Sequence, residues 1–186
     1  VFQPVFAQAG DGARGVVGLE ALVRWHSASL GPVGPGEFIP VAEESSLIVD
    51  LGDWILARAC TELQRLVAAG LGGLYVAVNV AEAQLARPDF AERVAGLLRQ
   101  SGLAPSQLEL EITERTLMAD TATHQRNLLS LRGHGVRLSV DDFGTGYSSL
   151  AYLMRFAVDK IKIDRSFVTG LDSGEGNPAV VRAMVA

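Results

Sequence analysis

The chain has 186 residues, of which 48% are hydrophobic and 20% are charged, and its formal net charge is -5 at pH 7. This apolar fraction excludes a disordered chain, and 20 glycines without a Gly-X-Y period exclude a collagen-like one. The acidic balance argues against a protein that holds a DNA or RNA polymer by lysine and arginine alone. Because no apolar run reaches about 18 residues, we expect no membrane contact by this domain and a cytoplasmic location.

Strand and helix patterns alternate along the chain. Residues 1–6 and 16–25 have a strand pattern, and residues 47–69 have apolar side chains at helical spacing, with Gly52 as a potential break and Cys60 as a small buried side chain. Further strands are predicted over residues 74–80, 108–113, 136–140 and 160–163, and helices over 88–101, 121–132, 148–156 and 178–186. This order implies βα units and a mainly parallel sheet, which fits both a doubly wound sheet and a β/α barrel.

Carboxylates and one carboxamide gather at the carboxyl ends of the predicted strands. They are Glu20, Asn79, Glu111, Glu114, Asp141, Asp142 and Asp164. Functional sites form at this edge in α/β folds, and converging oxygen atoms suit Mg²⁺ or Mn²⁺. A single acid at a strand end is more often a helix cap or a turn residue. Glu20 and Glu111, however, lie within apolar strands, where an unpaired charge is costly.

The glycine-containing run at 141–146, Asp-Asp-Phe-Gly-Thr-Gly, does not fit the dinucleotide-binding fingerprint. Ser149 stands where the third glycine belongs, and the two acids would face a pyrophosphate. The acids can also be interpreted as an Asx-turn or an N-cap before a glycine loop. Lys162 alternates with apolar neighbours and should point to the same side as Lys160. It is either a solvated strand lysine or a group that holds an anion or a hydroxide beside the acids.

Motifs along the whole chain resemble those of EAL domains, the bacterial phosphodiesterases that hydrolyse cyclic di-GMP. The first motif is Gly-Leu-Glu-Ala-Leu-Val-Arg-Trp at residues 18–25. The others are Phe-Gln-Pro at 2–4, Phe-Ile-Pro-Val-Ala-Glu at 38–43, Asn79, Glu-Ile-Thr-Glu at 111–114, Asp-Asp-Phe-Gly-Thr-Gly-Tyr-Ser-Ser-Leu at 141–150 and Lys-Ile-Asp-Arg-Ser-Phe at 162–167. Residues 1–186 are therefore identified as a member of this family, incomplete at the C-terminus.

The resemblance implies an α/β fold, namely a modified TIM-like β/α barrel whose first strand runs antiparallel. The family continues through a Glu-Gly-Val-Glu strand and a Gln-Gly segment, and the sequence stops at Ala186 before both. We therefore expect strands 7 and 8 to be missing and the 186-residue chain to be inactive by itself. The sequence also has Ser46 where the family commonly has glycine, and Ala81 where it often has serine.

The resemblance also implies a site that holds two Mg²⁺ or Mn²⁺ ions. The family's metal ligands match Glu20, Asn79, Glu111, Asp141 and Asp142. Catalytic roles fall on Lys162, near the attacking water, on Asp142, and on Glu114, which resembles the glutamate that anchors the loop after the aspartate pair. Arg24 would hold a substrate phosphate, and Gln3 and Leu22 would lie along the substrate groove.

The implied reaction is hydrolysis of cyclic di-GMP to linear pGpG by in-line water attack, which lowers the level of the second messenger. The resemblance further implies a homodimer formed through the EAL domain, and a parent chain with sensory or GGDEF domains that could be anchored to a membrane. The alternative is a receptor that binds cyclic di-GMP without cleaving it. Receptors of this kind usually lose the first-motif glutamate or the aspartate pair, whereas Glu20, Asp141 and Asp142 are present. A structural module with neither activity would leave the buried acids unexplained.

Overall fold

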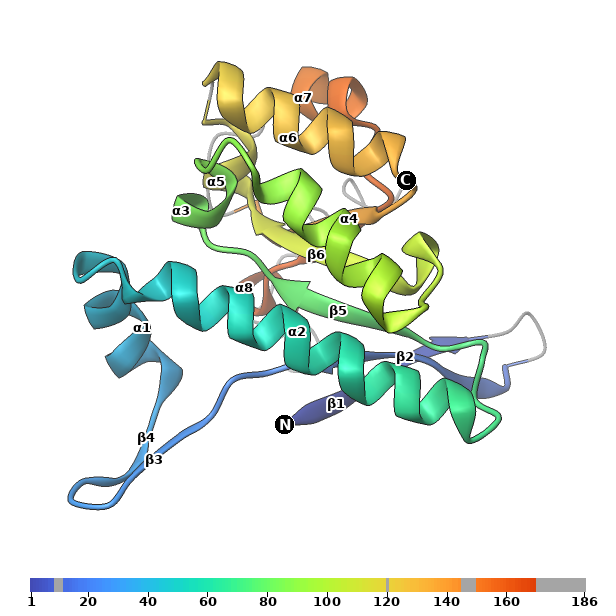
Figure 1. The fold of residues 1–186 in the computed structure, drawn as a ribbon, viewed down its shortest axis with the longest axis horizontal. Helices are drawn as coiled ribbons and strands as arrows, with labels where there is room; N and C mark the ends of the chain where they lie inside the picture. The colour runs from blue at the N-terminus through green and yellow to red at the C-terminus, as the bar shows by residue number, and fades with distance from the viewer. Residues whose placement is uncertain (9–11, 120, 145–149, 170–186) are drawn as a thin grey trace.

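The computed structural model describes residues 1–8, 12–119, 121–144 and 150–169, without the side chains of 150–152. Six strands form one curled sheet in the order β1-β2-β5-β6-β7-β8 (Figure 1). Their bounds are β1 Phe2–Gln8, β2 Arg14–Ala21, β5 Tyr75–Asn79, β6 Leu108–Thr113, β7 Arg137–Phe143 and β8 Lys160–Ile163. The helix predicted over 178–186 lies outside the described residues.

The pairing of the strands decides between the two architectures that the sequence pattern allows. β1 runs antiparallel to β2, and every other neighbouring pair is parallel. The strands follow chain order across the sheet, without the reversal that defines a doubly wound fold. The described residues therefore form a curled, incomplete barrel with six strands, and the predicted antiparallel first strand is confirmed.

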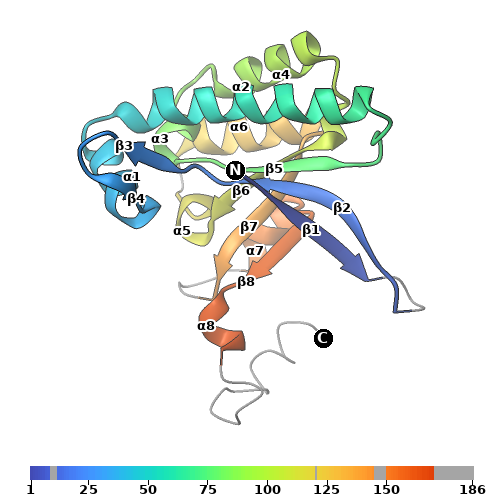
Figure 2. The same cartoon turned by 90° about the horizontal axis from the view of Figure 1, so that it is seen from below.

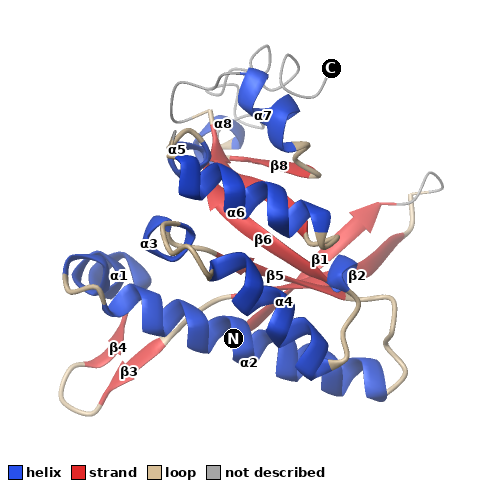
Figure 3. Cartoon of the chain, turned by 45° about the horizontal axis from the view of Figure 1, so that its top comes forward, coloured by secondary structure: helices blue, strands red, loops and turns tan. Residues whose placement is uncertain are grey.

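Three long helices cover the outer face of the sheet: α2 Leu47–Ala68, α4 Phe90–Ser101 and α6 Ala122–Gly133. They lie together on one side of the strands, while β1–β2 and β7–β8 both bend away from them (Figures 2 and 3). The shorter helices are α1 Pro35–Glu44, α3 Glu82–Leu85, α5 Glu114–Leu117, α7 Leu150–Phe156, α8 Arg165–Val168 and the 3₁₀ turn Pro105–Gln107. In the described part of the chain, no helix is long and apolar enough to span a bilayer.

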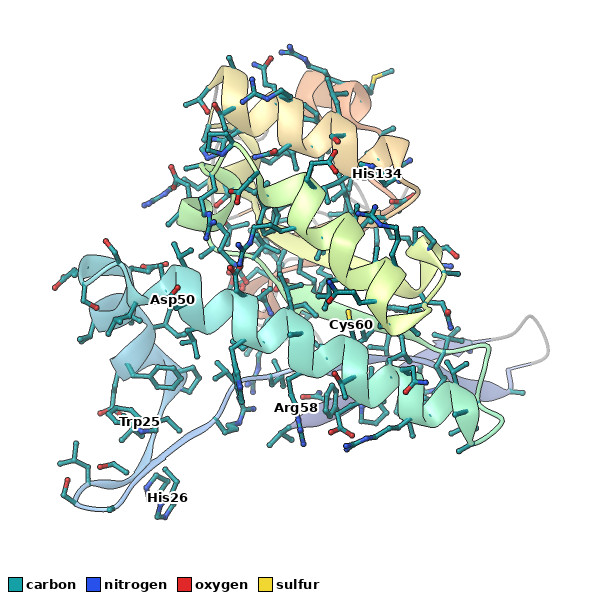
Figure 4. All side chains as sticks on the ribbon, viewed as in Figure 1. Trp25, His26, Asp50, Arg58, Cys60 and His134 are labelled. Carbon is teal, nitrogen blue, oxygen red and sulfur yellow. The ribbon has the colours of Figure 1, made fainter. Side chains whose placement is uncertain are left out.

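The core lies between the sheet and the helices. On β6, the alternate residues Leu108, Leu110 and Ile112 are buried among apolar neighbours. Because successive strand residues point to opposite faces, Glu109 and Glu111 point to the concave inner face. Cys60 of α2 is fully buried in the core, as predicted (Figure 4). The strand period thus separates an apolar outer layer from a charged interior.

One sequence prediction is corrected in the first half of the chain. The strand predicted over 16–25 leaves the sheet after Ala21, and Trp25–Ser27 instead forms a small hairpin, β3, with β4 Gly31–Val33. The Trp25 ring packs edge-on against Phe38 of α1, with ring centroids 5.8 Å apart (Figure 4). Trp25 therefore packs against α1 outside the sheet, although the residues after Ala21 continue the pattern of a strand.

The backbone at the start of α2 explains why glycine is common in the family at position 46, where this chain has serine. Ser46 precedes the helix with a φ of 62°, in the left-handed region that favours glycine. The helix then runs through Gly52 without a break, contrary to the interruption considered above. That glycine is required for packing, because a Cβ there would lie 2.2 Å from Oε1 of Gln84.

Candidate functional site

The parallel strands bring the predicted site residues to one edge of the concave face. Glu20 is the last residue but one of β2, Asn79 ends β5, and Glu111 lies directly beside Asn79 on β6. Asp141 follows on β7, where it pairs with Thr113. All four come from the carboxyl halves of their strands, so their polar groups lie in one layer at the same end of the sheet.

Lys162 of β8 lies at the centre of three carboxylates. Its Nζ is 2.9 Å from Oε2 of Glu111, 3.1 Å from Oδ2 of Asp141 and 3.5 Å from Oε1 of Glu20. Three strands separate β2 from β8 in the sheet order, so the contact with Glu20 crosses the hollow of the curled sheet. The curvature therefore assembles one charge cluster from strands that are not neighbours.

Burial sets the electrostatics of this cluster. Glu111 is only 3% exposed, and burial raises its pKa to about 7, against the hydrogen bond and charge of Lys162, which lower it. For Lys162, burial lowers the pKa, but the hydrogen bond to Glu111 and the charges of Glu111, Asp141 and Glu20 outweigh it and raise the pKa above its usual value. Lys162 therefore stays protonated at neutral pH.

A bulge in β7 explains how two consecutive aspartates reach the same edge. The register shifts between Val140 and Phe143, so that Asp141 and Asp142 together oppose the single residue Lys162. Asp142 adopts a left-handed φ of 54°, and its backbone N–H donates to Oδ1 of Asp141 at 3.0 Å. Burial, followed by the negative charge of Asp141, raises the pKa of Asp142.

Glu114 connects β6 to the segment that follows the aspartate pair. Its carboxylate is buried, and Oε2 accepts a hydrogen bond from the backbone N–H of Gly144 at 3.0 Å. Thr113 caps α5 by accepting from the N–H of Thr116 at 3.2 Å, which holds the turn that carries Glu114. By contrast, Asp164 serves as an ordinary cap, accepting from the N–H of Ser166 at 2.8 Å.

The family model for the EAL domain matches residues 1–186. The chain belongs to the EAL domain family. It is 45% identical to the cyclic di-GMP phosphodiesterase NbdA of Pseudomonas aeruginosa, over all of this chain and 23% of that protein. It is 40% identical to MucR of the same organism, a bifunctional diguanylate cyclase/cyclic di-GMP phosphodiesterase, over 92% of this chain and 25% of that one.

A solved structure of the P. aeruginosa MucR phosphodiesterase in complex with c-di-GMP is similar to this EAL domain. The TM-score is 0.89 at 39% sequence identity, over 99% of this chain and 73% of that one. This likeness supports the incomplete barrel described above. The chain spans only about a quarter of the curated relatives it matches.

The donor atoms of this EAL domain fit a hard divalent cation by their chemistry. Within the described residues, no three His, Cys, Asp or Glu side chains are arranged to hold a metal ion as they stand. The ammonium of Lys162 instead offsets part of the negative charge of Glu20, Glu111 and Asp141. Because all three carboxylates contact the Lys162 ammonium, their oxygen atoms reach a common point. Oxygen donors of this kind are the ligands that Mg²⁺ and Mn²⁺ prefer.

The residues expected to bind substrate lie near this edge, though only two of them line the same cavity. Leu22, Arg24 and Asn79 line a cavity of about 560 Å³ beside the carboxylate layer. Arg24 donates to the neighbouring carbonyl of Val23 at 2.8 Å, and Glu43 and Glu82 line the same cavity. Gln3 lies apart from the cavity on β1, opposite Glu20 in the register.

Sequence reasoning missed several residues around the site. Arg115 and Gln84 also line the cavity, and both lie a few residues after a strand end, which is the signal that could have indicated them. Glu109 was likewise overlooked, although it alternates with Glu111 on β6. Its buried carboxylate forms an ion pair with the partly exposed Lys160, which lies on the same side of β8 as Lys162, as predicted.

Proposed function

We propose that the full protein hydrolyses cyclic di-GMP to linear pGpG. The observation that carries this proposal is the convergence of Glu20, Glu111 and Asp141 on Lys162 at the carboxyl edge of the barrel. Support comes from the relative named cyclic di-GMP phosphodiesterase NbdA and from the MucR structure in complex with c-di-GMP. The chain contains every site residue that the family resemblance predicted within it, which favours hydrolysis over a receptor that only binds cyclic di-GMP.

The proposal includes two divalent cations, Mg²⁺ or Mn²⁺. Glu20, Asn79, Glu111 and Asp141 would hold one ion, and Asp141 with Asp142 would hold the second. When bound, such ions lower the pKa of a coordinated water and stabilise the attacking and leaving oxygens of an in-line displacement. They would also supply the positive charge that a protein with a net charge of -5 needs to bind a dianionic substrate.

The side chains of the chain itself have distinct tasks in this proposal. Lys162 keeps its proton, so its Nζ donates a hydrogen bond that orients the attacking water. Arg24, which lines the cavity beside the carboxylates, would bind a phosphate oxygen, and Leu22 and Gln3 would hold the nucleotide along the groove. Glu114 keeps the start of the following loop in place through the N–H of Gly144.

Product analysis tests this proposal directly. The full-length protein is incubated with cyclic di-GMP and either Mg²⁺ or Mn²⁺, and the nucleotides are separated by chromatography and weighed by mass spectrometry. We expect pGpG, and we expect Glu20→Gln to abolish it while Glu92→Gln, on the exposed surface of α4, does not. Binding of cyclic di-GMP without turnover by either ion would refute hydrolysis and favour a receptor.

The context of the domain is part of the proposal. We infer fusion to sensory or GGDEF domains, because the matched relatives are about four times longer and one is named a bifunctional cyclase and phosphodiesterase. A homodimer and a cytoplasmic location complete the proposal and rest on the family resemblance alone. The isolated 186-residue chain is expected to lack activity, because its described sheet has six strands where a complete barrel has about eight. Measuring cyclic di-GMP hydrolysis by the full-length protein and by the isolated chain tests this expectation.

A further inference from the structure

A second set of polar side chains lies beneath the carboxylate layer on the concave face. Lys160 Nζ donates to both oxygens of Glu109, at 2.7 and 2.8 Å, and to the hydroxyl of Tyr75 at 2.7 Å. The Glu109 side chain is only 2% exposed. We call these three residues the lower polar cluster. They lie nearer the amino ends of their strands than the layer that the proposed reaction uses, so hydrolysis by itself gives no reason for burying the Glu109 carboxylate.

The cluster repeats the charge pattern of the site on the same strands. β6 carries glutamates at 109 and 111, and β8 carries lysines at 160 and 162. A shift of β8 by two residues would keep every side chain on its present face, because the strand period is two. It would also pair Lys160 with Glu111 and carry Lys162 past the carboxylates. The alternation of apolar and polar residues therefore does not fix the register of β8.

Tyr75 and Glu109 distinguish the two registers. The hydroxyl of Tyr75 accepts a hydrogen bond from Lys160 in the observed register, and its ring packs over Gly18, where a Cβ would lie 2.5 Å from the ring. A slip that moved Lys160 to Glu111 would leave Glu109 buried without its partner. An unpaired buried carboxylate is strongly unfavourable, so the lower polar cluster penalises that slip.

We propose that Tyr75, Glu109 and Lys160 are positioning residues that fix the register of β8 and thereby place Lys162 among the site carboxylates. They act through Lys162 and do not touch the reacting atoms. This inference rests on the proposed hydrolysis where activity is measured. The measurement of metal binding does not need hydrolysis, because the position of Lys162 also affects the site carboxylates in the absence of substrate.

The test uses the full-length protein and two readouts. Mn²⁺ affinity is measured without substrate by electron paramagnetic resonance, and kcat and KM are measured with cyclic di-GMP. Lys160→Met should weaken Mn²⁺ binding and lower kcat by about tenfold each, with little change in KM. The exchanged pair Glu109→Lys/Lys160→Glu should recover most of both, because it restores the ion pair. The control is Arg58→Met, which removes an exposed ion pair with Glu62 within α2 and should change neither value.

Tyr75→Phe provides a milder variant, since it removes only one hydroxyl and keeps the ring over Gly18. We expect about a fivefold loss in Mn²⁺ affinity and kcat, the equivalent of one hydrogen bond. The inference is overturned if Tyr75→Phe retains both wild-type values, or if the exchanged pair melts like the wild type and recovers neither. A wild type that binds Mn²⁺ without cleaving cyclic di-GMP refutes the proposed hydrolysis alone, and the Mn²⁺ measurements still decide the positioning role.

Discussion

Replacing Gly52 by alanine separates helix propensity from packing. Gly52 lies within α2, where the helix passes Gln84 of α3, and an added Cβ would lie 2.2 Å from Oε1, 2.3 Å from Cδ and 2.5 Å from Nε2. The Gln84 carboxamide is buried, accepts from the N–H of Ala81 at 3.2 Å and donates to Oδ1 of Asp53 at 3.2 Å. Gly52→Ala must therefore displace this carboxamide.

The opposing terms can be compared in magnitude. Helix propensity alone predicts that alanine stabilises the protein by about 1 kcal/mol. Overpacking a buried contact costs about 1 to 3 kcal/mol, and each of the two displaced hydrogen bonds costs about 1 kcal/mol. The balance predicts a loss of about 3 kcal/mol in the free energy of unfolding. For a domain of this size, that loss lowers Tm by about 9 °C.

Differential scanning calorimetry of the wild type and two variants, all made in the same polypeptide, measures this balance. The matched control is Gly96→Ala in α4, where the added Cβ would meet only Nη2 of Arg99, at 3.8 Å. That substitution should stabilise by about 1 kcal/mol, because it gains helix propensity without a clash. If Gly52→Ala raises Tm as Gly96→Ala does, the packing argument is wrong.

Three further predictions concern single residues. Ser46→Gly should stabilise the protein by about 1 kcal/mol, because it relieves a left-handed φ of 62°, while Ser45→Gly, at a φ of -88°, should not. Burial raises the pKa of Cys60 to about 11, so alkylation at pH 8 should be at least about 100-fold slower in the native protein than in urea. Glu114→Ala removes the acceptor for the N–H of Gly144 and should lower kcat about tenfold without changing Mn²⁺ affinity.

Each of these has a clear contrary outcome. A lower Tm for the Ser46→Gly variant, measured by calorimetry, would show that the serine side chain contributes more than the backbone strain. Equal alkylation rates in buffer and in urea, followed by mass spectrometry, would contradict the burial of Cys60. Weaker Mn²⁺ binding after Glu114→Ala would mean that Glu114 acts on the metal ligands instead of the loop.

Local patterns predicted the strands and the faces of their residues well. The alternation over 108–113 correctly indicated a strand, and in the structure it separates Leu108 and Leu110, which lie in the core, from Glu109 and Glu111 on the opposite face. The same local rules failed after β2, where residues up to Trp25 continue a strand-like pattern. There the packing of Trp25 on α1 decided the conformation, and its partner Phe38 cannot be inferred from a local window.

Helix α1 and the continuity of α2 were also decided by context. Pro40 lies inside α1, where propensity opposes a helix, and Gly52 lies inside α2, where it weakens one. Local rules disfavour a helix at both residues, and the sequence analysis considered a break at Gly52. The structure keeps both helices, because burial of Ala42 in the first and the close approach of Gln84 to the second outweigh the local cost.

By itself, the sequence determined the order of strands and helices, the residue types at the strand ends and the resemblance to EAL domains. It did not determine which charges meet. Lys162 reaches Glu20 only because the sheet curls, bringing β8 across the hollow to β2 although three strands lie between them. The pairing of Lys160 with Glu109 likewise depends on the register across β7. Tertiary structure decided these contacts, since curvature and register arise from packing between segments that are distant in the chain.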